Sequence, residues 1–146
     1  MNLYRTKRSE TTEQIRVIQW AKHHESEYPM LKWLIHIPNG GRRDRKEAAV
    51  LRQMGVKSGV SDLFLPFPAY SHIDKFSNHG LFIEMKYGDN KVSRDQQQFL
   101  NDMEENGYYV AVCYSYNQAV KVLEGYITST ISKPNNSIWK DEISGQ

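Results

Sequence analysis

The segment GLFIEMKYGDNKVSRDQQQFL, residues 80–100, joins an apolar strand to charged residues at its end. The apolar run from Leu81 to Ile83 predicts a buried strand. The same run continues directly into Glu84 and Lys86. Charges at the end of a core strand are costly unless they are paired or take part in chemistry. The segment therefore indicates both a central strand and the place to look for a functional site.

Helix and strand patterns extend outward from this segment along a chain of 146 residues, a length typical of one domain. Residues 69–79 carry no clear pattern and are expected to form a long polar connection. The polar tail 132–146 is expected to attach loosely. The order α-β-α-β-β-α-β-α predicts a mixed α/β fold. Its expected elements are a helix at 9–26, a strand within 33–41, a helix at 43–55, a strand starting near Asp62, the strand at 80–87, a helix at 93–107, a strand at 108–115 and a helix at 116–127.

The strands near Asp62 and Glu84 follow each other with no helical pattern between them, which favours an antiparallel pair. In such a pair the start of one strand lies beside the end of the next. Asp62 opens its strand, whereas Glu84 and Lys86 close theirs. The alternation of side chains along a strand also puts Glu84 and Lys86 on one face. We therefore expect these three residues to meet at one end of the sheet.

Two carboxylates that converge in this way form an oxygen-rich site suited to Mg²⁺ or Mn²⁺. A bound cation would lower the pKa of water and stabilise charge on a phosphate, and Lys86 would assist. A carboxylate of the first helix, Glu10 or Glu13, is expected to complete the site. The simpler alternative is an ion pair between Glu84 and Lys86 on an edge strand.

The charge distribution favours a phosphate-rich partner, although the net charge is only +2. A basic cluster occupies residues 40–59, with a solvated helix face as the alternative reading; it contains Arg42, Arg43, Arg45, Lys46, Arg52 and Lys57. A single cysteine, Cys113, excludes an internal disulfide framework and multi-cysteine zinc sites. No apolar run approaches the length of a membrane span, and no signal-peptide pattern opens the sequence. A reducing, cytoplasmic setting is therefore expected.

The ordered motifs GVKSGVSD at 55–62, IEMK at 83–86 and SRDQ at 93–96 resemble the VRR-NUC nucleases. This family belongs to the PD-(D/E)XK, restriction-endonuclease-like superfamily. The resemblance extends from about Ser9 to Ile127 and implies a mixed central sheet flanked by helices. It assigns residues 9–131 to the nuclease domain. One departure is that Ser61 stands where the superfamily motif has proline.

The resemblance also implies a set of site residues. Asp62 and Glu84 would bind Mg²⁺ or Mn²⁺ together with the backbone carbonyl of Met85, and Lys86 would assist the attacking water. Glu10 matches the glutamate of the first helix, with Glu13 as the second choice, and Gln96 matches a glutamine near the active site. Contacts with DNA are expected from Asn39, Arg42, Arg43 and Lys57, of which Asn39 has an alternative role in a simple Asn-Gly turn.

These residues together predict a metal-dependent DNA endonuclease that hydrolyses phosphodiester bonds. Compact members of the family resemble phage and bacterial proteins and are similar in layout to Holliday junction resolvases. The resemblance therefore implies a homodimer that acts on branched DNA in the cytoplasm of a bacterial or phage-infected cell. The alternatives are a nickase or restriction-type nuclease without branch preference, a non-catalytic DNA-binding protein of the same fold, and an RNA nuclease.

Overall fold

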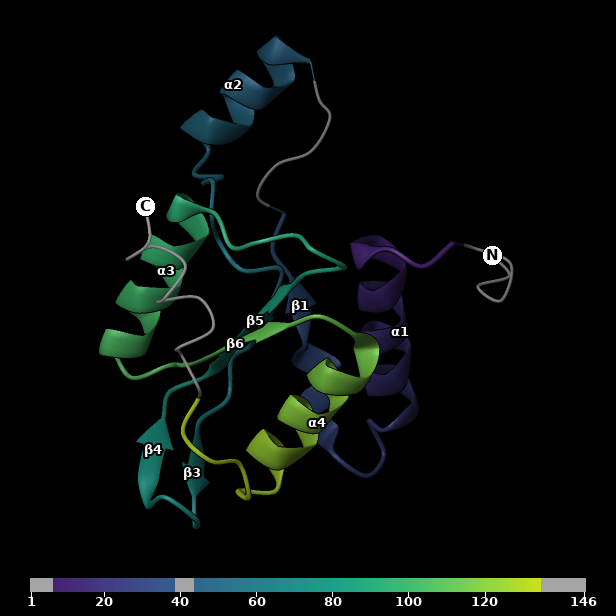
Figure 1. Cartoon of the computed structure of the whole chain (residues 1–146), viewed down its shortest axis with the longest axis vertical. Helices are drawn as coiled ribbons and strands as arrows, with labels where there is room; N and C mark the ends of the chain where they lie inside the picture. Colours follow the sequence, from purple (N-terminus) through teal and green to yellow (C-terminus); the bar gives the residue numbers. More distant parts are fainter. Residues whose placement is uncertain (1–6, 39–43, 135–146) are drawn as a thin grey trace.

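The computed structural model describes residues 7–38 and 44–134 and contains a mixed four-stranded sheet in the order β1-β2-β5-β6 (Figure 1). The β1–β2 and β2–β5 pairs are antiparallel, and the β5–β6 pair is parallel. Their bounds are β1 Ile35–His36, β2 Leu63–Leu65, β5 Leu81–Met85 and β6 Tyr109–Cys113. The mixed α/β fold predicted from the sequence is therefore confirmed.

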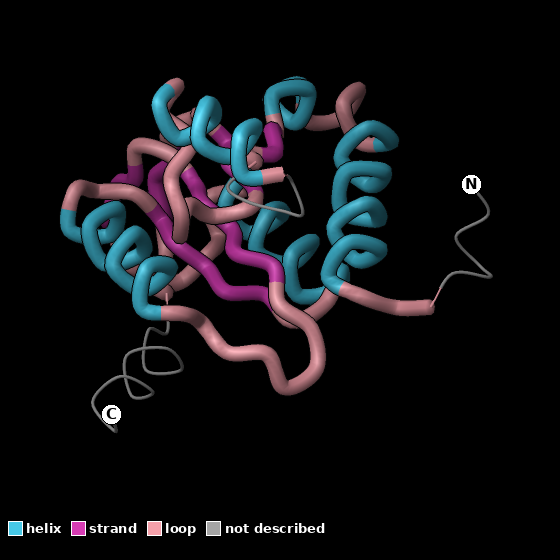
Figure 2. The backbone as a smooth tube through the Cα atoms, turned by 90° about the horizontal axis from the view of Figure 1, so that it is seen from above, coloured by secondary structure: helices cyan, strands magenta, loops and turns pink. Residues whose placement is uncertain are grey.

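Helices cover both faces of the sheet (Figures 1 and 2). One apolar cluster joins α1 and α4 to the face that carries Leu81, Ile83 and Met85. A second cluster joins α3 to the opposite face through Phe82 and Leu100. This division follows the alternation of side chains along β5, whose five residues are all buried. The helices are α1 Glu10–His23, α2 Arg45–Gln53, α3 Arg94–Glu105 and α4 Tyr116–Ile127, with a 3₁₀ helix, η2, at Pro29–Trp33.

The polar connection expected at 69–79 is instead a small antiparallel hairpin of β3, Ala69–Ser71, and β4, Phe76–Asn78. The predicted order of elements is therefore wrong at this point. Each strand has only three residues and carries Ser71 or Asn78 as its buried side chain, so no alternation of apolar and polar residues marks it. Lys75, with φ of 54°, supplies the left-handed turn between the strands.

Helix α2 differs from the other helices because none of its residues is buried. It stands apart from the sheet in Figure 1, beyond the end where β5 finishes. Asp44 caps its first turn by accepting a hydrogen bond from the Glu47 N–H at 2.7 Å.

Across the described residues, no helix has both the length and the apolar character needed to span a membrane.

Candidate active site

The antiparallel pairing of β2 and β5 brings Asp62 beside Glu84. Leu63 lies opposite Ile83 in the register, so Asp62, one residue earlier, falls at the level of Glu84. The Met85 N–H donates a hydrogen bond of 2.7 Å to Asp62 Oδ2, which ties the two strands together at this point. The meeting of Asp62, Glu84 and Lys86 predicted from the strand pattern is confirmed as an arrangement in space.

Glu84, Lys86 and Gln96 form a buried polar network. Lys86 Nζ lies 3.7 Å from Glu84 Oε1 and donates a hydrogen bond of 2.8 Å to Gln96 Oε1. The Gln96 amide nitrogen donates at 2.8 Å to the same Glu84 oxygen. Both charged side chains are less than a tenth exposed. Gln96 therefore fixes the lysine and the glutamate relative to each other.

The start of α3 holds Gln96 in this position. Ser93 caps the helix by accepting a hydrogen bond from the Gln96 N–H, and its own N–H donates to Gln96 Oε1 at 2.9 Å. This reciprocal arrangement is a capping box. One glutamine side chain thus serves both the helix terminus and the site. The motif SRDQ at 93–96 therefore caps helix α3 and also provides Gln96 to the candidate site.

Burial and their closeness to each other disfavour the charged forms of the two carboxylates. Burial, reinforced by the nearby Asp62 carboxylate, raises the pKa of Glu84 to about 8, although Lys86 acts in the opposite direction. Burial also raises the pKa of Asp62, while the hydrogen bond from Met85 lowers it. Two neighbouring carboxylates in a poorly solvated place disfavour each other's charged form. A cation between them would remove that penalty.

The donor set fits a divalent cation. Glu84 Oε2 is buried and finds no hydrogen-bond partner among residues 7–38 and 44–134. The N–H and C=O of one strand residue point to the same side, so the Met85 carbonyl faces the strand that Asp62 opens. Oxygen donors of this kind suit Mg²⁺ or Mn²⁺. In the described part of the chain, no three acidic, histidine or cysteine side chains are arranged to hold a metal. The fit therefore rests on two carboxylates and a backbone carbonyl.

The first helix offers Glu10, and not Glu13, to this site. Glu10 borders the same hollow as Asp62, and its Oε2 accepts a hydrogen bond of 2.9 Å from Asn90. Glu13 is 1% exposed, and its two oxygens bind Arg8 at 2.7 Å and Arg16 at 3.2 Å. These ion pairs, which lower the pKa of Glu13 against the effect of its burial, give this residue a structural role.

His36, Gln14 and Asn90 also lie at the site, although the sequence did not mark them as site residues. His36 Nδ1 is 2.8 Å from the carbonyl oxygen of Asp62, and the Gln14 amide nitrogen is 3.1 Å from the same ring nitrogen. The sequence places His36 in a strand, but only the pairing of β1 with β2 brings it beside Asp62. Asn90 lies in a turn that carries no signal for a contact with the first helix.

The predicted DNA contacts are described only in part. Asn39, Arg42 and Arg43 lie outside the described residues. Lys57 is exposed in the loop that connects α2 to Asp62.

Cys113 is buried at the end of β6, and burial raises the pKa of its thiol to about 12, as expected for a packing residue.

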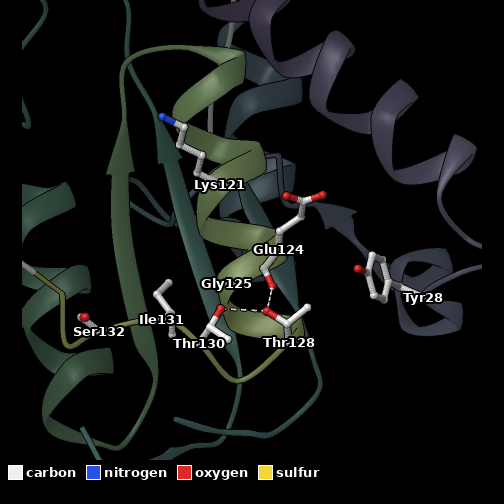
Figure 3. Close-up of a pocket in the computed structure, with 8 residues that line it drawn as sticks. All are labelled: Tyr28, Lys121, Glu124, Gly125, Thr128, Thr130, Ile131 and Ser132. Atoms are coloured by element: carbon white, nitrogen blue, oxygen red, sulfur yellow. Dashed lines mark hydrogen bonds between the residues drawn. The ribbon is translucent and has the colours of Figure 1, made fainter. Parts of the chain in front are cut away.

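A second hollow, of about 520 Å³, lies at the opposite end of the sheet (Figure 3). Tyr28 faces the last turn of α4 across it, and Thr128 there donates a hydrogen bond of 2.7 Å to the Glu124 carbonyl. Its lining residues do not include the carboxylates and lysine of the candidate site. Its size alone does not indicate chemistry, and the strand end remains the candidate active site.

The mixed sheet thus carries Asp62, Glu84 and Lys86 close together at the ends of two neighbouring strands. A family model described as the VRR-NUC domain matches residues 8–117, most of the chain. A solved structure described as "VRR_NUC domain protein" is similar, with a TM-score of 0.68 and 26% identity over 86% of this chain and 93% of that chain. A comparison with curated proteins finds no match. The chain belongs to the VRR-NUC family and is, at the level of that family, a nuclease.

Proposed function

We propose that the chain is a divalent-metal-dependent DNA endonuclease whose active site is formed by Asp62, Glu84 and Lys86. The observation that carries this proposal is the convergence of these three residues at one strand end, where Gln96 bridges Glu84 and Lys86. A protein that only bound DNA would have no need for a buried glutamate beside the half-buried carboxylate of Asp62. We assign the nuclease domain to residues 9–131.

Asp62, Glu84 and the carbonyl of Met85 would hold Mg²⁺ or Mn²⁺, and Glu10 is a further carboxylate that borders the same hollow as Asp62. The cation supplies positive charge that stabilises the phosphate in the transition state and lowers the pKa of water. Asp62 is held for this task by the Met85 N–H, and Glu84 by the Gln96 amide. The protein therefore orients the carboxylates before any ligand binds, which reduces the reorganisation that the reaction requires.

Lys86 would orient the attacking water. Its ammonium group is held by Gln96 Oε1 and lies near Glu84 Oε1, so its position does not depend on substrate. In hydrolysis the water oxygen forms a bond to phosphorus and loses a proton to solvent or a nearby base, while the bond from phosphorus to the leaving oxygen breaks and that oxygen takes up a proton from solvent. Lys86 would stabilise the charge that develops during this exchange.

A Glu84→Gln variant tests the metal site directly. Gln keeps the shape of the side chain but removes its charge, so we expect Mn²⁺ binding and cleavage of labelled DNA to fall at least about 100-fold. Calorimetry would measure Mn²⁺ binding, and a gel assay would measure cleavage. Glu13→Gln is the matched control, because Glu13 is an equally buried glutamate outside the site. Full metal-dependent cutting by Glu84→Gln would exclude the proposed site.

We further propose that the protein acts as a homodimer on branched DNA, as a Holliday junction resolvase does. In a symmetric dimer each protomer would cut one strand of a substrate with matching symmetry. Contacts with the DNA backbone would come from Arg42, Arg43 and Lys57, with Asn39 near the cut phosphate. A nickase or restriction-type nuclease without branch preference is the alternative. Light scattering measures the oligomeric state, and cleavage of a four-way junction and of its linear arms measures branch preference. A monomer that cuts both substrates equally well would contradict the proposed dimer that acts on branched DNA.

A further inference from the structure

Helix α2, Arg45–Gln53, projects from the body of the fold and has no part in the proposed chemistry. None of its residues is buried, whereas α1, α3 and α4 each bury at least two side chains. In Figure 1 it stands beyond the end of the sheet where β5 finishes, which is the end that carries the candidate site. The helix is therefore accessible along its length and lies toward the place of cleavage.

One side of α2 carries long polar side chains around a small central residue. Because a helix has 3.6 residues per turn, positions 45, 46, 49, 52 and 53 fall within an arc of about 120°. The four outer positions are exposed, and Ala49 between them is half-buried. Three of the outer side chains are cations and one is an amide; they are Arg45, Lys46, Arg52 and Gln53. We call these four residues, with Ala49, the basic face.

The charges of the basic face favour DNA over a second copy of the chain. The face contains no carboxylate, because Glu47 lies on the opposite side of the helix by the same geometry, and Asp44 caps the first turn. Two such faces would repel each other. The phosphates of DNA would instead attract the three cations.

The dimensions of α2 match the major groove of duplex DNA. An α-helix with its side chains is about 10–12 Å across, and the major groove is about 12 Å wide. A helix enters the groove only where its flanks are clear of the rest of the protein. Helix α2 meets this condition, since it buries none of its residues. The small side chain of Ale49 would let the backbone come close to the edges of the bases.

The basic face also carries side chains that distinguish base pairs. In the major groove, arginine donates two hydrogen bonds to guanine, and glutamine pairs with adenine through its amide. A surface that only neutralised phosphates would have no use for Gln53. We propose that α2 lies in the major groove beside the cut and recognises base pairs through Arg45, Arg52 and Gln53. This inference rests on the proposed nuclease function and gives that function a sequence preference.

The connection to Asp62 limits where the recognised base pairs lie. The chain advances nine residues from Gln53 to Asp62, and nine residues span at most about 32 Å. One turn of duplex DNA is about 34–36 Å long. Within this connection Gly59 packs closely against Asp95, which anchors it to α3. The recognised base pairs should therefore lie within about one turn of the cut.

Selection from random DNA tests the proposal. The full-length protein would be incubated in EDTA with linear duplexes that carry a randomised block, and the bound molecules would be sequenced. We expect the wild type to enrich a short motif, with each recognised base pair favoured about 5- to 150-fold, the range for one bidentate contact. In Mg²⁺ or Mn²⁺, the mapped cuts should lie within about one turn of this motif.

Gln53→Ala separates recognition of bases from attraction to phosphates, because it removes no charge. The variant should make one position of the motif degenerate and leave the salt dependence of binding unchanged. Arg52→Ala should make a second position degenerate. Met54→Ala is the matched control, since Met54 is 77% exposed and lies on the opposite side of the helix. The motif that this control selects should equal that of the wild type.

The outcomes separate this proposal from its alternatives and from the nuclease function. Wild type that binds all sequences equally, with Arg52→Ala weaker on all of them, would make α2 a phosphate contact and overturn the proposal. A motif that survives both Gln53→Ala and Arg52→Ala would also overturn it. So would wild type that selects no motif, together with a lower mass of Met54→Ala in light scattering, since α2 would then join two copies. A motif selected as proposed, without cutting in any metal, would contradict the nuclease function alone.

Discussion

At the scale of single residues, the surroundings of Glu84 disfavour the charged form of its carboxyl group. Burial and the Asp62 carboxylate raise the pKa of Glu84 to about 8. Lys86 and Gln96 hold Glu84 Oε1, whereas Oε2 has no hydrogen-bond partner within the described residues. Ligand oxygens must lose their protons before they bind a metal. Metal binding and the protonation of this residue are therefore opposed.

This opposition predicts how the stability of the metal-free protein depends on pH. A carboxyl whose pKa is raised by folding stabilises the protein below its unfolded pKa and loses that contribution as the pH rises through the folded value. We expect the melting temperature without metal to fall from about pH 5 to about pH 9, with a free-energy change on the order of a few kcal/mol. Scanning calorimetry in EDTA measures it. Mg²⁺ should restore more stability at the high end of this range than at the low end.

Glu84→Gln is the control for this effect, because it cannot ionise. The variant should lose most of the pH dependence in that interval, and the remainder should come from Asp62, whose pKa is also raised. A wild-type melting curve that does not change over the interval would show that Glu84 is not held protonated.

At the scale of structural elements, Gly59 allows the loop before Asp62 to pack closely against the first turn of α3, which carries Gln96. It lies in the loop between α2 and β2, with φ of +90°, and a Cβ there would be 2.5 Å from the carbonyl carbon and oxygen of Asp95. Asp95 precedes Gln96 on α3. The loop that leads to Asp62 therefore packs against the turn that carries Gln96, and only glycine allows this approach.

Gly59→Ala should consequently destabilise the protein and weaken the site together. Gly55→Ala is the matched control, since Gly55 has φ of +108° but a Cβ there would meet nothing within 4 Å. Both changes introduce backbone strain, and we expect Gly59→Ala to cost at least about 1 kcal/mol more because of the overlap with Asp95. Urea unfolding gives the two free energies. Equal losses in the two variants would contradict the close packing.

The pairing of the strands separates what could be predicted from the sequence from what could not. The pairing of β2 with β5 follows from adjacent apolar runs with no helix between them, and it was enough to predict the meeting of Asp62, Glu84 and Lys86. The β3–β4 hairpin was missed because its short strands have no apolar alternation. The contact of His36 with Asp62 was missed because it depends on the register between β1 and β2. The periodicity of apolar residues along a sequence does not show which residues of these two short strands lie opposite each other.

At the scale of the whole molecule, the site lies at one end of the sheet, and the β3–β4 hairpin lies at the other (Figure 1). The loop of Lys57 leads directly to Asp62, so DNA held at the site would pass near this exposed lysine. Lys133 offers a comparison, since its backbone N–H donates a hydrogen bond to Asp74 of the hairpin. The two exposed lysines thus belong to opposite ends of the fold.

Lys57→Ala should weaken DNA binding similarly for all sequences. The slope of log K against log salt should become shallower by about 0.9, the value for one lost phosphate contact on duplex DNA. Anisotropy titrations at several salt concentrations measure the slope. Lys133→Ala should leave it unchanged, and an equal change in both variants would contradict the assigned DNA path.

The central claim is that Lys86 acts in metal-dependent cleavage at the site it shares with Asp62 and Glu84. The most direct measurement compares the wild type with Lys86→Met, which keeps the length of the side chain, on a labelled four-way junction and a linear duplex in Mg²⁺, Mn²⁺ or EDTA. We predict cutting by the wild type only with metal and a loss of at least about 100-fold in the variant, with DNA binding retained. Wild type that binds DNA without cutting in either metal, or Lys86→Met that cuts at the wild-type rate, would contradict the claim.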